Sequence, residues 1–318
     1  MKRIAYILLM LAISLPLISC QVPADIEDDM IENAAFPITI DGVIIENSPK
    51  SVISLSPAIT EIIFEMGYED TLIGRSRYCD FPPEVEEIQS VGSGANPDID
   101  SIVDLAPNVV ICGSALAQKD TAYLNDKNIN VVVIPIAKTI NQFYKGYEII
   151  GTLFEGAIKG VNKGQETYEA LKSRIDAEIN KHSSDRKTFA YITTSSNTIA
   201  TGDTFEDAIL TIFGDNIAAD ASNYQYSLKD VDKANPDVIY IHKSIDEDKI
   251  SKKKELANTT AVKNGNIIKI DNIYFERPSL RILELIEQLS PSEQEDAQSK
   301  EEESTDTGDE NTPPANGD

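Results

Sequence analysis

The chain has 318 residues, of which 41% are hydrophobic, and it carries 53 acidic side chains against 28 basic ones. This length favours two domains over one, and the apolar content suffices for folded cores. A formal charge of −25 excludes nucleic acid as the natural partner and disfavours electrostatic docking onto an anionic membrane. Two histidines argue against a histidine-rich metal or catalytic centre, and the absence of tryptophan removes the commonest ring for stacking on flat ligands.

The N-terminus has the pattern of an export signal. Lys2 and Arg3 precede an apolar run, residues 4–17, that is shorter than the span of about 20 residues that a bilayer requires. Leu17-Ile18-Ser19-Cys20 then resembles the bacterial lipobox, in which the cysteine is diacylated after cleavage. The alternative is an ordinary signal peptide with a chance cysteine. The resemblance predicts a signal peptide over 1–19 and a lipid on Cys20 that anchors the protein outside the cytoplasmic membrane.

Two acidic segments flank the central region. Residues 21–35 hold five acids and no base, which predicts a flexible tether over 20–37. Residues 291–318 hold ten acids and one lysine, which predicts a disordered tail. The two segments account for about half of the mature charge of −27, so the central region is only moderately acidic.

The first half of the central region, predicted as an N-terminal lobe over 38–155, alternates strands and helices. Asp41-Gly42 supplies a primed turn for a hairpin over 38–45. The later strands are short Val/Ile runs, which is typical of parallel strands covered on both faces. The predicted strands are 51–55, 72–73, 109–112 and 130–136, and the predicted helices are 57–66, 99–105 and 119–127.

A long helical pattern comes next. Apolar residues keep a spacing of three or four from Ile140 to Phe154, and the pattern resumes after Gly156. A helix over 157–182 would be about 39 Å long at 1.5 Å per residue, which is long enough to link two lobes. We therefore predict an interlobe helix within 156–183.

The second half, predicted as a C-terminal lobe over 184–290, repeats the alternation. Positions from Ile99 to Val110 match positions from Leu228 to Ile239 at a constant offset of 129, and helices ending at Gly67 and Gly214 form a weaker echo. We therefore predict two similar α/β lobes with parallel sheets and a ligand cleft between them, at the carboxyl ends of the strands. The predicted strands are 188–193, 238–241 and 266–270, and the predicted helices are 204–213, 228–234 and 279–289.

The chain lacks the phosphate-binding glycine loops and the Gly-x-Ser-x-Gly elbow of common enzymes. A catalytic triad would need His182 or His242. His242 is the better placed of the two, but its position at a strand end is more typical of a half-exposed polar residue than of a catalytic base. Asp80 beside Cys79 has no third metal ligand. An exported protein could form a disulfide between Cys79 and Cys112, but two unpaired cysteines in the core are the favoured interpretation. A binding protein is therefore favoured over an enzyme.

Pro49–Glu61 resembles the opening of the class III, helical-backbone substrate-binding proteins of ABC importers, which serve cobalamin, ferric siderophores and haem. Gly74–Glu84 resembles most closely the cobalamin-binding branch, where a Tyr-x-Asp-Tyr/Phe-Pro-Pro segment follows the second strand. Asn96–Ile111 and Phe275–Arg277 with Arg281 are also similar to that branch. The resemblance covers about residues 38–290 and implies two Rossmann-like lobes joined by one rigid helix.

The resemblance also implies the residues of the cleft. Tyr78 and Tyr274 offer flat faces with a polar tip, and Arg277 offers a planar fork for ligand carbonyls or anions. The structural alternatives are core aromatics and an ion pair between Arg277 and Glu276 or a neighbour. We expect no metal ligand from the protein and no cofactor of its own. The candidate ligand-binding residues are Tyr78, Arg277, Tyr274, Phe275, Arg77 and Ser56.

The family carries one glutamate on each lobe to pair with permease arginines. Here these positions are Asp100 and Lys229, so Asp230 or Asp232 is the candidate substitute on the second lobe, with Asp230 as the chosen candidate. Asp100 also fits a helix N-terminal acid. The chain departs from the cobalamin binders in lacking tryptophan, which leaves haem, siderophores and other cobamides open as ligands.

These features predict an extracytoplasmic, lipid-anchored and monomeric receptor, in the periplasm or at the cell surface. It would capture a bulky metal chelate and deliver it to the permease and ATPase of an ABC importer, without catalysing a reaction. One competing function is an exported hydrolase or metal-dependent enzyme with His242 as its base. Another is a lipid-tethered signalling or adhesion module that binds a protein.

Overall fold

The computed structural model describes residues 35–181 and 186–289, which belong to one compact unit beginning at Ala35. The predicted signal peptide, most of the tether and the acidic tail lie outside the described residues, as do Cys20 and His182. None of the described helices has the length and apolar character that crossing a bilayer requires.

The first half of the described chain builds a parallel sheet in the order β4-β3-β7-β8. The predicted hairpin is present ahead of it: β1 and β2 pair antiparallel, and Asp41 and Gly42 turn the chain with φ values of 51° and 76°. The elements are β1 (Ile38–Ile40), β2 (Val43–Ile45), β3 (Val52–Ser54), α2 (Pro57–Glu65), β4 (Leu72–Arg75), β5 (Gly92–Ser93), β6 (Asn96–Pro97), α3 (Ile99–Leu105), β7 (Val109–Cys112), α4 (Gln118–Asp126) and β8 (Asn130–Val133).

Both faces of this sheet are covered, as the continuous Val/Ile runs predicted. Ile53 and Val110 belong to an apolar cluster that includes Ile102 of α3. The neighbouring residues Val52 and Val109 point the other way and belong to the large cluster that contains residues of α2 and of the helix α5 (Ile140–Glu155). Because successive side chains of a strand alternate between faces, each strand contributes to two cores.

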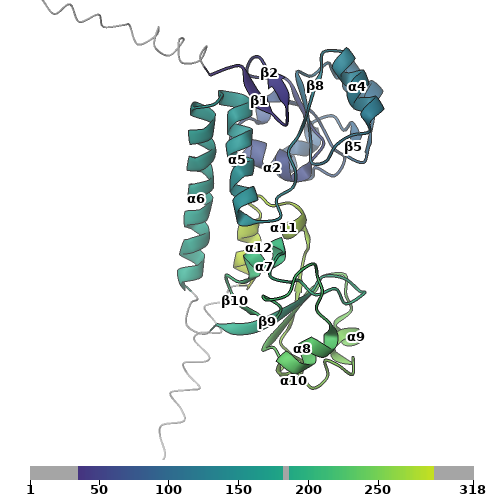
Figure 1. Cartoon of the computed structure of the whole chain (residues 1–318), viewed down its shortest axis with the longest axis vertical. Helices are drawn as coiled ribbons and strands as arrows, with labels where there is room; N and C mark the ends of the chain where they lie inside the picture. The colour runs from purple at the N-terminus through teal and green to yellow at the C-terminus, as the bar shows by residue number, and fades with distance from the viewer. Residues whose placement is uncertain (1–34, 182–185, 290–318) are drawn as a thin grey trace, which may run out of the picture. The chain divides into compact units, whose positions relative to one another are not determined.

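Helix α5 lies alongside α6 (Lys159–Lys181), which begins two residues later than the predicted interlobe helix, 157–182 (Figure 1). Glycines allow the two backbones to approach closely. A Cβ on Gly151 would lie 2.0 Å from the carbonyl oxygen of Gly160, and a Cβ on Gly164 would lie 2.4 Å from that of Tyr147. No larger residue fits at these positions without moving a helix.

The second half builds a second parallel sheet in the order β10-β9-β11-β12. We number the strands of each four-stranded sheet from one to four in chain order, and we call these the strands of its half. Both sheets then have the order second-first-third-fourth, so the two predicted α/β halves share one topology. The elements are β9 (Lys187–Ile192), α7 (Phe205–Leu210), β10 (Gly214–Asn216), α8 (Leu228–Ala234), β11 (Val238–His242), α9 (Glu247–Ser251), α10 (Thr260–Lys263), β12 (Ile267–Ile270), α11 (Ile273–Glu276) and α12 (Ile282–Leu289).

The repeat at an offset of 129 is confirmed in detail. Helices α3 and α8 have seven residues each, and each is followed by a residue with positive φ, Ala106 at 47° and Asn235 at 52°. The side chains of Asp98 and Ser227 cap the two helix starts at equivalent positions. The same local signals therefore produce the same unit twice.

One large apolar cluster contains residues from both halves. It includes Val52 and Val109 of the first sheet, Phe189 and Tyr240 of the second, and Leu171 of α6. Because these residues form one cluster, the two sheets and the long helix pair belong to the same packed unit.

Some predicted elements differ from those observed. The predicted strand 130–136 and the helices 204–213 and 279–289 are each shorter in the structure. Gly214, predicted to end a helix, instead begins β10, where a Cβ would lie 2.2 Å from the carbonyl oxygen of Lys187. The short elements β5, β6, β10, α9, α10 and α11 were not predicted.

Candidate functional site

A cleft of about 950 Å³ opens between residues of the two halves. Each half contributes the segments that follow its first, second and fourth strands, so the cleft lies at the carboxyl ends of the strands, where ligands of parallel α/β sheets bind. We call the residues of the first half the first wall: Pro57, Ala58, Tyr78, Ile136, Ala137 and Lys138. We call those of the second half the second wall: Asp203, Thr204, Phe205, Glu206, Asn223, Tyr224, Asn272, Phe275, Glu276 and Arg277.

Tyr78 projects from the first wall with 56% of its surface exposed. The turn that holds it follows β4: the Ser76 hydroxyl accepts the backbone N–H of Tyr78 at 3.2 Å. The next residue, Cys79, is buried with its sulfur 3.1 Å from the Thr60 hydroxyl. Anchoring Cys79 in this way directs the neighbouring Tyr78 side chain outward, where its ring can meet a ligand.

Tyr224 is the counterpart of Tyr78 on the second wall, because each follows the second strand of its half. Asn223 and Tyr224 both have positive φ, 54° and 58°, a costly conformation for residues with a side chain. The Asp203 carboxylate accepts the Asn223 N–H at 2.9 Å, and the Thr201 hydroxyl accepts the Tyr224 N–H at 3.0 Å. These bonds hold the turn and leave Tyr224 41% exposed in the cleft.

The second wall carries three carboxylates, from Asp203, Glu206 and Glu276. Hydrogen bonds from Thr201 and from the Asn223 N–H hold the pKa of Asp203 below its usual value, so this side chain is ionised. Burial raises the pKa of Glu206 above its usual value, and the Tyr224 hydroxyl donates to its carboxylate at 3.4 Å. The first wall has no acid, and its one charged residue is Lys138.

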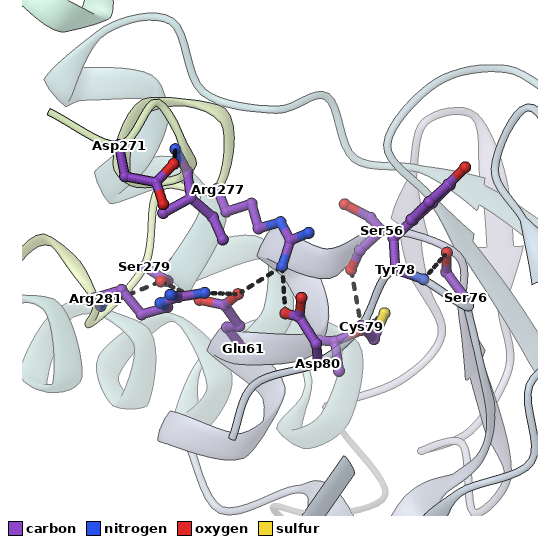
Figure 2. Close-up of polar contacts among 12 residues, drawn as sticks. Ser56, Glu61, Ser76, Tyr78, Cys79, Asp80, Asp271, Arg277, Ser279 and Arg281 are labelled. Atoms are coloured by element: carbon purple, nitrogen blue, oxygen red, sulfur yellow. Dashed lines mark hydrogen bonds and ion pairs between the residues drawn. The ribbon is translucent and has the colours of Figure 1, made fainter. Parts of the chain in front are cut away.

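Arg277 lies at the edge of the second wall and reaches across to the first half (Figure 2). Its Nη1 lies 2.5 Å from Oδ1 of Asp80 and 3.9 Å from Oε1 of Glu61. On the other side of Glu61, Arg281 lies at 3.8 Å and the Ser279 hydroxyl donates to Oε2 at 2.5 Å. Arg277 therefore does form an ion pair, the expected structural alternative, but with Asp80, which is 197 residues away in the sequence.

Glu61 is the buried centre of this cluster, with 4% of its surface exposed. Loss of hydration on burial raises its pKa to about 7, against the opposing effects of the Ser279 hydrogen bond and the two arginines. Its Oε1 accepts no hydrogen bond within the described part of the chain. The cluster therefore joins α2 to the segment after α11 through charges that are only partly solvated.

The candidate ligand-binding residues separate into two groups. Tyr78, Phe275 and Arg277 line the cleft, although Phe275 is largely buried against Tyr191. Three candidates are absent from the lining: Ser56, which is buried, Tyr274, which packs beside Arg281, and Arg77, whose guanidinium lies 5.4 Å from the centre of the Tyr78 ring.

The other candidates occupy the surface or the core. Asp100 and Asp230 are both exposed, and Asp230 forms a capping box with Ser227 at the start of α8. Cys79 and Cys112 are buried and free, as favoured from the sequence. His242, the base required by the enzyme alternative, forms a hydrogen bond of 2.6 Å with Ser244 and does not line the cleft. In the described residues no group of three His, Cys, Asp or Glu side chains could hold a metal ion.

Sequence reasoning missed several residues of the cleft, chiefly Tyr224, Glu206, Asn272 and Lys138. The available signal was positional: Tyr224, Glu206 and Lys138 each follow a strand that corresponds to one preceding a recognised segment in the other half, and Asn272 lies just before the recognised segment 274–277. Aligning the two halves strand by strand would have directed attention from Tyr78 to Tyr224.

The sequence of residues 52–274 matches the model of a family described as periplasmic binding protein. The chain belongs to this family. It is thus an extracytoplasmic substrate-binding protein of the kind that serves ABC transporters, and not an enzyme, which confirms the function class expected from the sequence. Periplasmic binding proteins bind a small molecule and hand it on, so the cleft is the natural place for that ligand.

Individual relatives agree with the family. The chain is 27% identical to the ABC transporter substrate-binding lipoprotein YvrC of Bacillus subtilis, over 92% of this chain and 97% of that protein. It is 23% identical to a cobalamin-binding protein of Halobacterium salinarum, over 79% and 72% of the two chains. Among solved structures, the periplasmic haem-binding protein HutB of Vibrio cholerae has the same fold, with a TM-score of 0.65 and 20% identity over 75% of this chain and 96% of that one.

Proposed function

We propose that this periplasmic binding protein is the lipid-anchored receptor of an ABC importer for a bulky metal chelate: cobalamin or another cobamide, a ferric siderophore, or haem. The similarity to cobalamin-binding and haem-binding proteins supports this ligand class. The lipid on Cys20 would keep the receptor, as a monomer, next to the permease and ATPase that complete the importer.

One observation carries this proposal: the cleft offers an exposed tyrosine from each wall at equivalent positions of the two halves. A volume of about 950 Å³ lies at the upper end of the range for small-molecule sites, so it suits a ligand larger than an amino acid or a sugar. Tyr78 and Tyr224 present rings with polar tips, which suit a macrocycle edge bearing amides or other polar groups. Ile136 adds an exposed apolar side chain to the first wall.

The architecture also supports delivery without catalysis. Helices α3 and α8 begin the repeated unit in each half, and their exposed residues Asp100 and Asp230 are the proposed contacts for permease arginines. We further propose the lobe boundaries expected from the sequence, 38–155 and 184–290, with the interlobe helix between them.

The test is a titration of the purified protein with cyanocobalamin, haemin and a panel of ferric siderophores by equilibrium dialysis, read from the absorbance of each chelate. We expect saturable binding of at least one chelate at a one-to-one ratio. Tyr78→Ala should weaken that binding about tenfold, because one aromatic face is removed from the cleft. Tyr123→Ala, which removes an exposed tyrosine of α4 outside the cleft, is the matched control and should leave it unchanged.

Two results would contradict these expectations. No saturable binding of any chelate would contradict the receptor function for this ligand class. Equal affinities of the Tyr78→Ala and Tyr123→Ala variants would place Tyr78 outside the ligand contact.

A further inference from the structure

The cleft volume limits the size of the ligand, and the charged residues of the cleft limit the charge of the ligand as well. Three carboxylates line the second wall, from Asp203, Glu206 and Glu276, against two cations in the whole cleft, Lys138 and Arg277. Glu276 is exposed and forms no ion pair within the described part of the chain. The uncompensated charge that a ligand meets on this wall is therefore negative.

Arg277 does not offset this charge, because its guanidinium is already neutralised. Asp80 lies within 2.5 Å of it, and the buried Glu61 lies at 3.9 Å. An anionic ligand group that took Nη1 from Asp80 would leave that carboxylate unpaired, and one that bound elsewhere on the guanidinium would lie beside the Asp80 charge. Asp80 thus occupies one of the positions that a ligand carboxylate or phosphate would take.

Lys138 is the remaining cation, and it is exposed on the first wall. Water and salt screen its ammonium group as they screen the exposed carboxylates of Asp203 and Glu276, so it offsets at most one of these two charges. One screened cation does not balance the carboxylates opposite it.

We propose that the ligand of this cleft is a metal chelate without net negative charge, neutral or cationic, and that Asp80 enforces this choice by holding Arg277. This inference rests on the proposed receptor function and names the ligand class of the same site. Neutral amide or hydroxamate oxygens can still accept hydrogen bonds from the tyrosine hydroxyls and from Asn272. Chelates whose carboxylates or catecholates leave them anionic are selected against, and haem, with its two propionates, is the one proposed ligand that this preference disfavours.

The test uses probes of similar build and different charge, titrated into the wild-type protein by equilibrium dialysis. Dicyanocobinamide, with amide side chains, is compared with dicyanocobyrinic acid, whose side chains are carboxylates. Cationic ferrioxamine B and neutral ferrichrome are compared with trianionic ferric enterobactin. In every pair that binds, we expect the anionic member to bind at least about tenfold more weakly, and the difference to shrink in high salt.

Three variants locate the cause. Asp80→Asn frees Arg277 and should strengthen binding of the anionic probes about tenfold, while Glu276→Gln, at an exposed site, should strengthen it a few-fold. Asp126→Asn makes the same charge change at an exposed site on α4 outside the cleft and should change nothing. If both cleft variants retain the weak anion binding of the wild type, Asp80 and the acidic wall do not set the preference, and the inference is wrong.

The outcomes distinguish this inference from the proposed function. An anionic probe that binds the wild type as tightly as its neutral partner overturns the charge preference and leaves the receptor in place. Failure of every probe, and of the cyanocobalamin and haemin titrated above, to bind overturns the receptor function for metal chelates, and the charge preference with it.

Discussion

The two halves of the described chain have the same sheet order and supply the cleft from the same three strand ends, yet the walls they build differ in charge. The first wall is apolar around Tyr78 and Ile136, with Lys138 as its only charge. The second wall repeats the tyrosine as Tyr224 but surrounds it with carboxylates. Backbone topology thus determines where the site lies, and the side chains on the repeated framework determine what it accepts.

The same contrast appears away from the cleft. The units α3–β7 and α8–β11 match in length, cap position and left-handed termination. Their second helical residues are Asp100 and Lys229, which have opposite charges. The repeated backbone is therefore maintained by caps and apolar positions, while exposed positions are free to diverge.

The largest expected effect comes from separating α5 and α6, the helix pair between the two sheets. Gly164→Ala places a Cβ 2.4 Å from the backbone carbonyl oxygen of Tyr147, so α5 and α6 must move apart. We expect a loss of about 3 kcal/mol in the free energy of unfolding, measured by urea denaturation. Gly146→Ala is the control within α5, because its Cβ would meet only Ile62, at 3.9 Å, and it should be neutral or stabilising by about 0.5–1 kcal/mol. Equal effects of the two substitutions would show that the close helix contact is not required.

The first half also holds two carboxylates, Glu61 and Glu65, that are buried or half-buried and do not line the cleft. Glu61 and Glu65 lie on α2, and burial raises the pKa of each to about 7. A carboxyl group whose pKa is higher in the folded than in the unfolded state binds more protons when folded. Its stabilising contribution is complete below about pH 4.5 and is lost as the pH rises through about 7.

This direction of the pH dependence of stability gives a second prediction. The free energy of unfolding of the wild type should fall between pH 5 and pH 7.5, and Glu61→Gln should remove about 2 kcal/mol of that fall because glutamine does not titrate. Urea denaturation at several pH values measures the slope. Glu87→Gln makes the same substitution at an exposed site and serves as the control. A Glu61→Gln slope that equals the wild-type slope would show that Glu61 keeps its charge throughout this range.

Much of the fold could be predicted because its signals are local. Helix α8 has the predicted bounds: Ser227 and Asp230 cap its start, and Asn235 with Pro236 ends it. Strand β10 was missed because Gly214–Asn216 has poor strand propensity and forms only by pairing with β9.

The site was less predictable, since its geometry depends on contacts distant in sequence. The position of Tyr224 depends on Asp203 and Thr201, whose hydrogen bonds hold an unfavourable backbone conformation that no local pattern reveals. Likewise, Arg277 has its partner, Asp80, in the other half of the chain. Residue types indicated which side chains could bind a ligand, whereas their partners follow from tertiary structure alone.

The smallest predicted effect distinguishes the two proposed permease contacts. Asp230 accepts the Ser227 N–H at 3.1 Å in a capping box, so Asp230→Ala should cost about 1 kcal/mol of unfolding free energy as well as any transport defect. Asp100 makes no such cap, and Asp100→Ala should change stability by less than about 0.5 kcal/mol while reducing chelate uptake by cells that depend on this importer. Thermal or urea unfolding and an uptake assay on the same variants separate the two roles. Normal uptake with Asp100→Ala would remove Asp100 from the permease interface and leave it as a surface acid near a helix N-terminus.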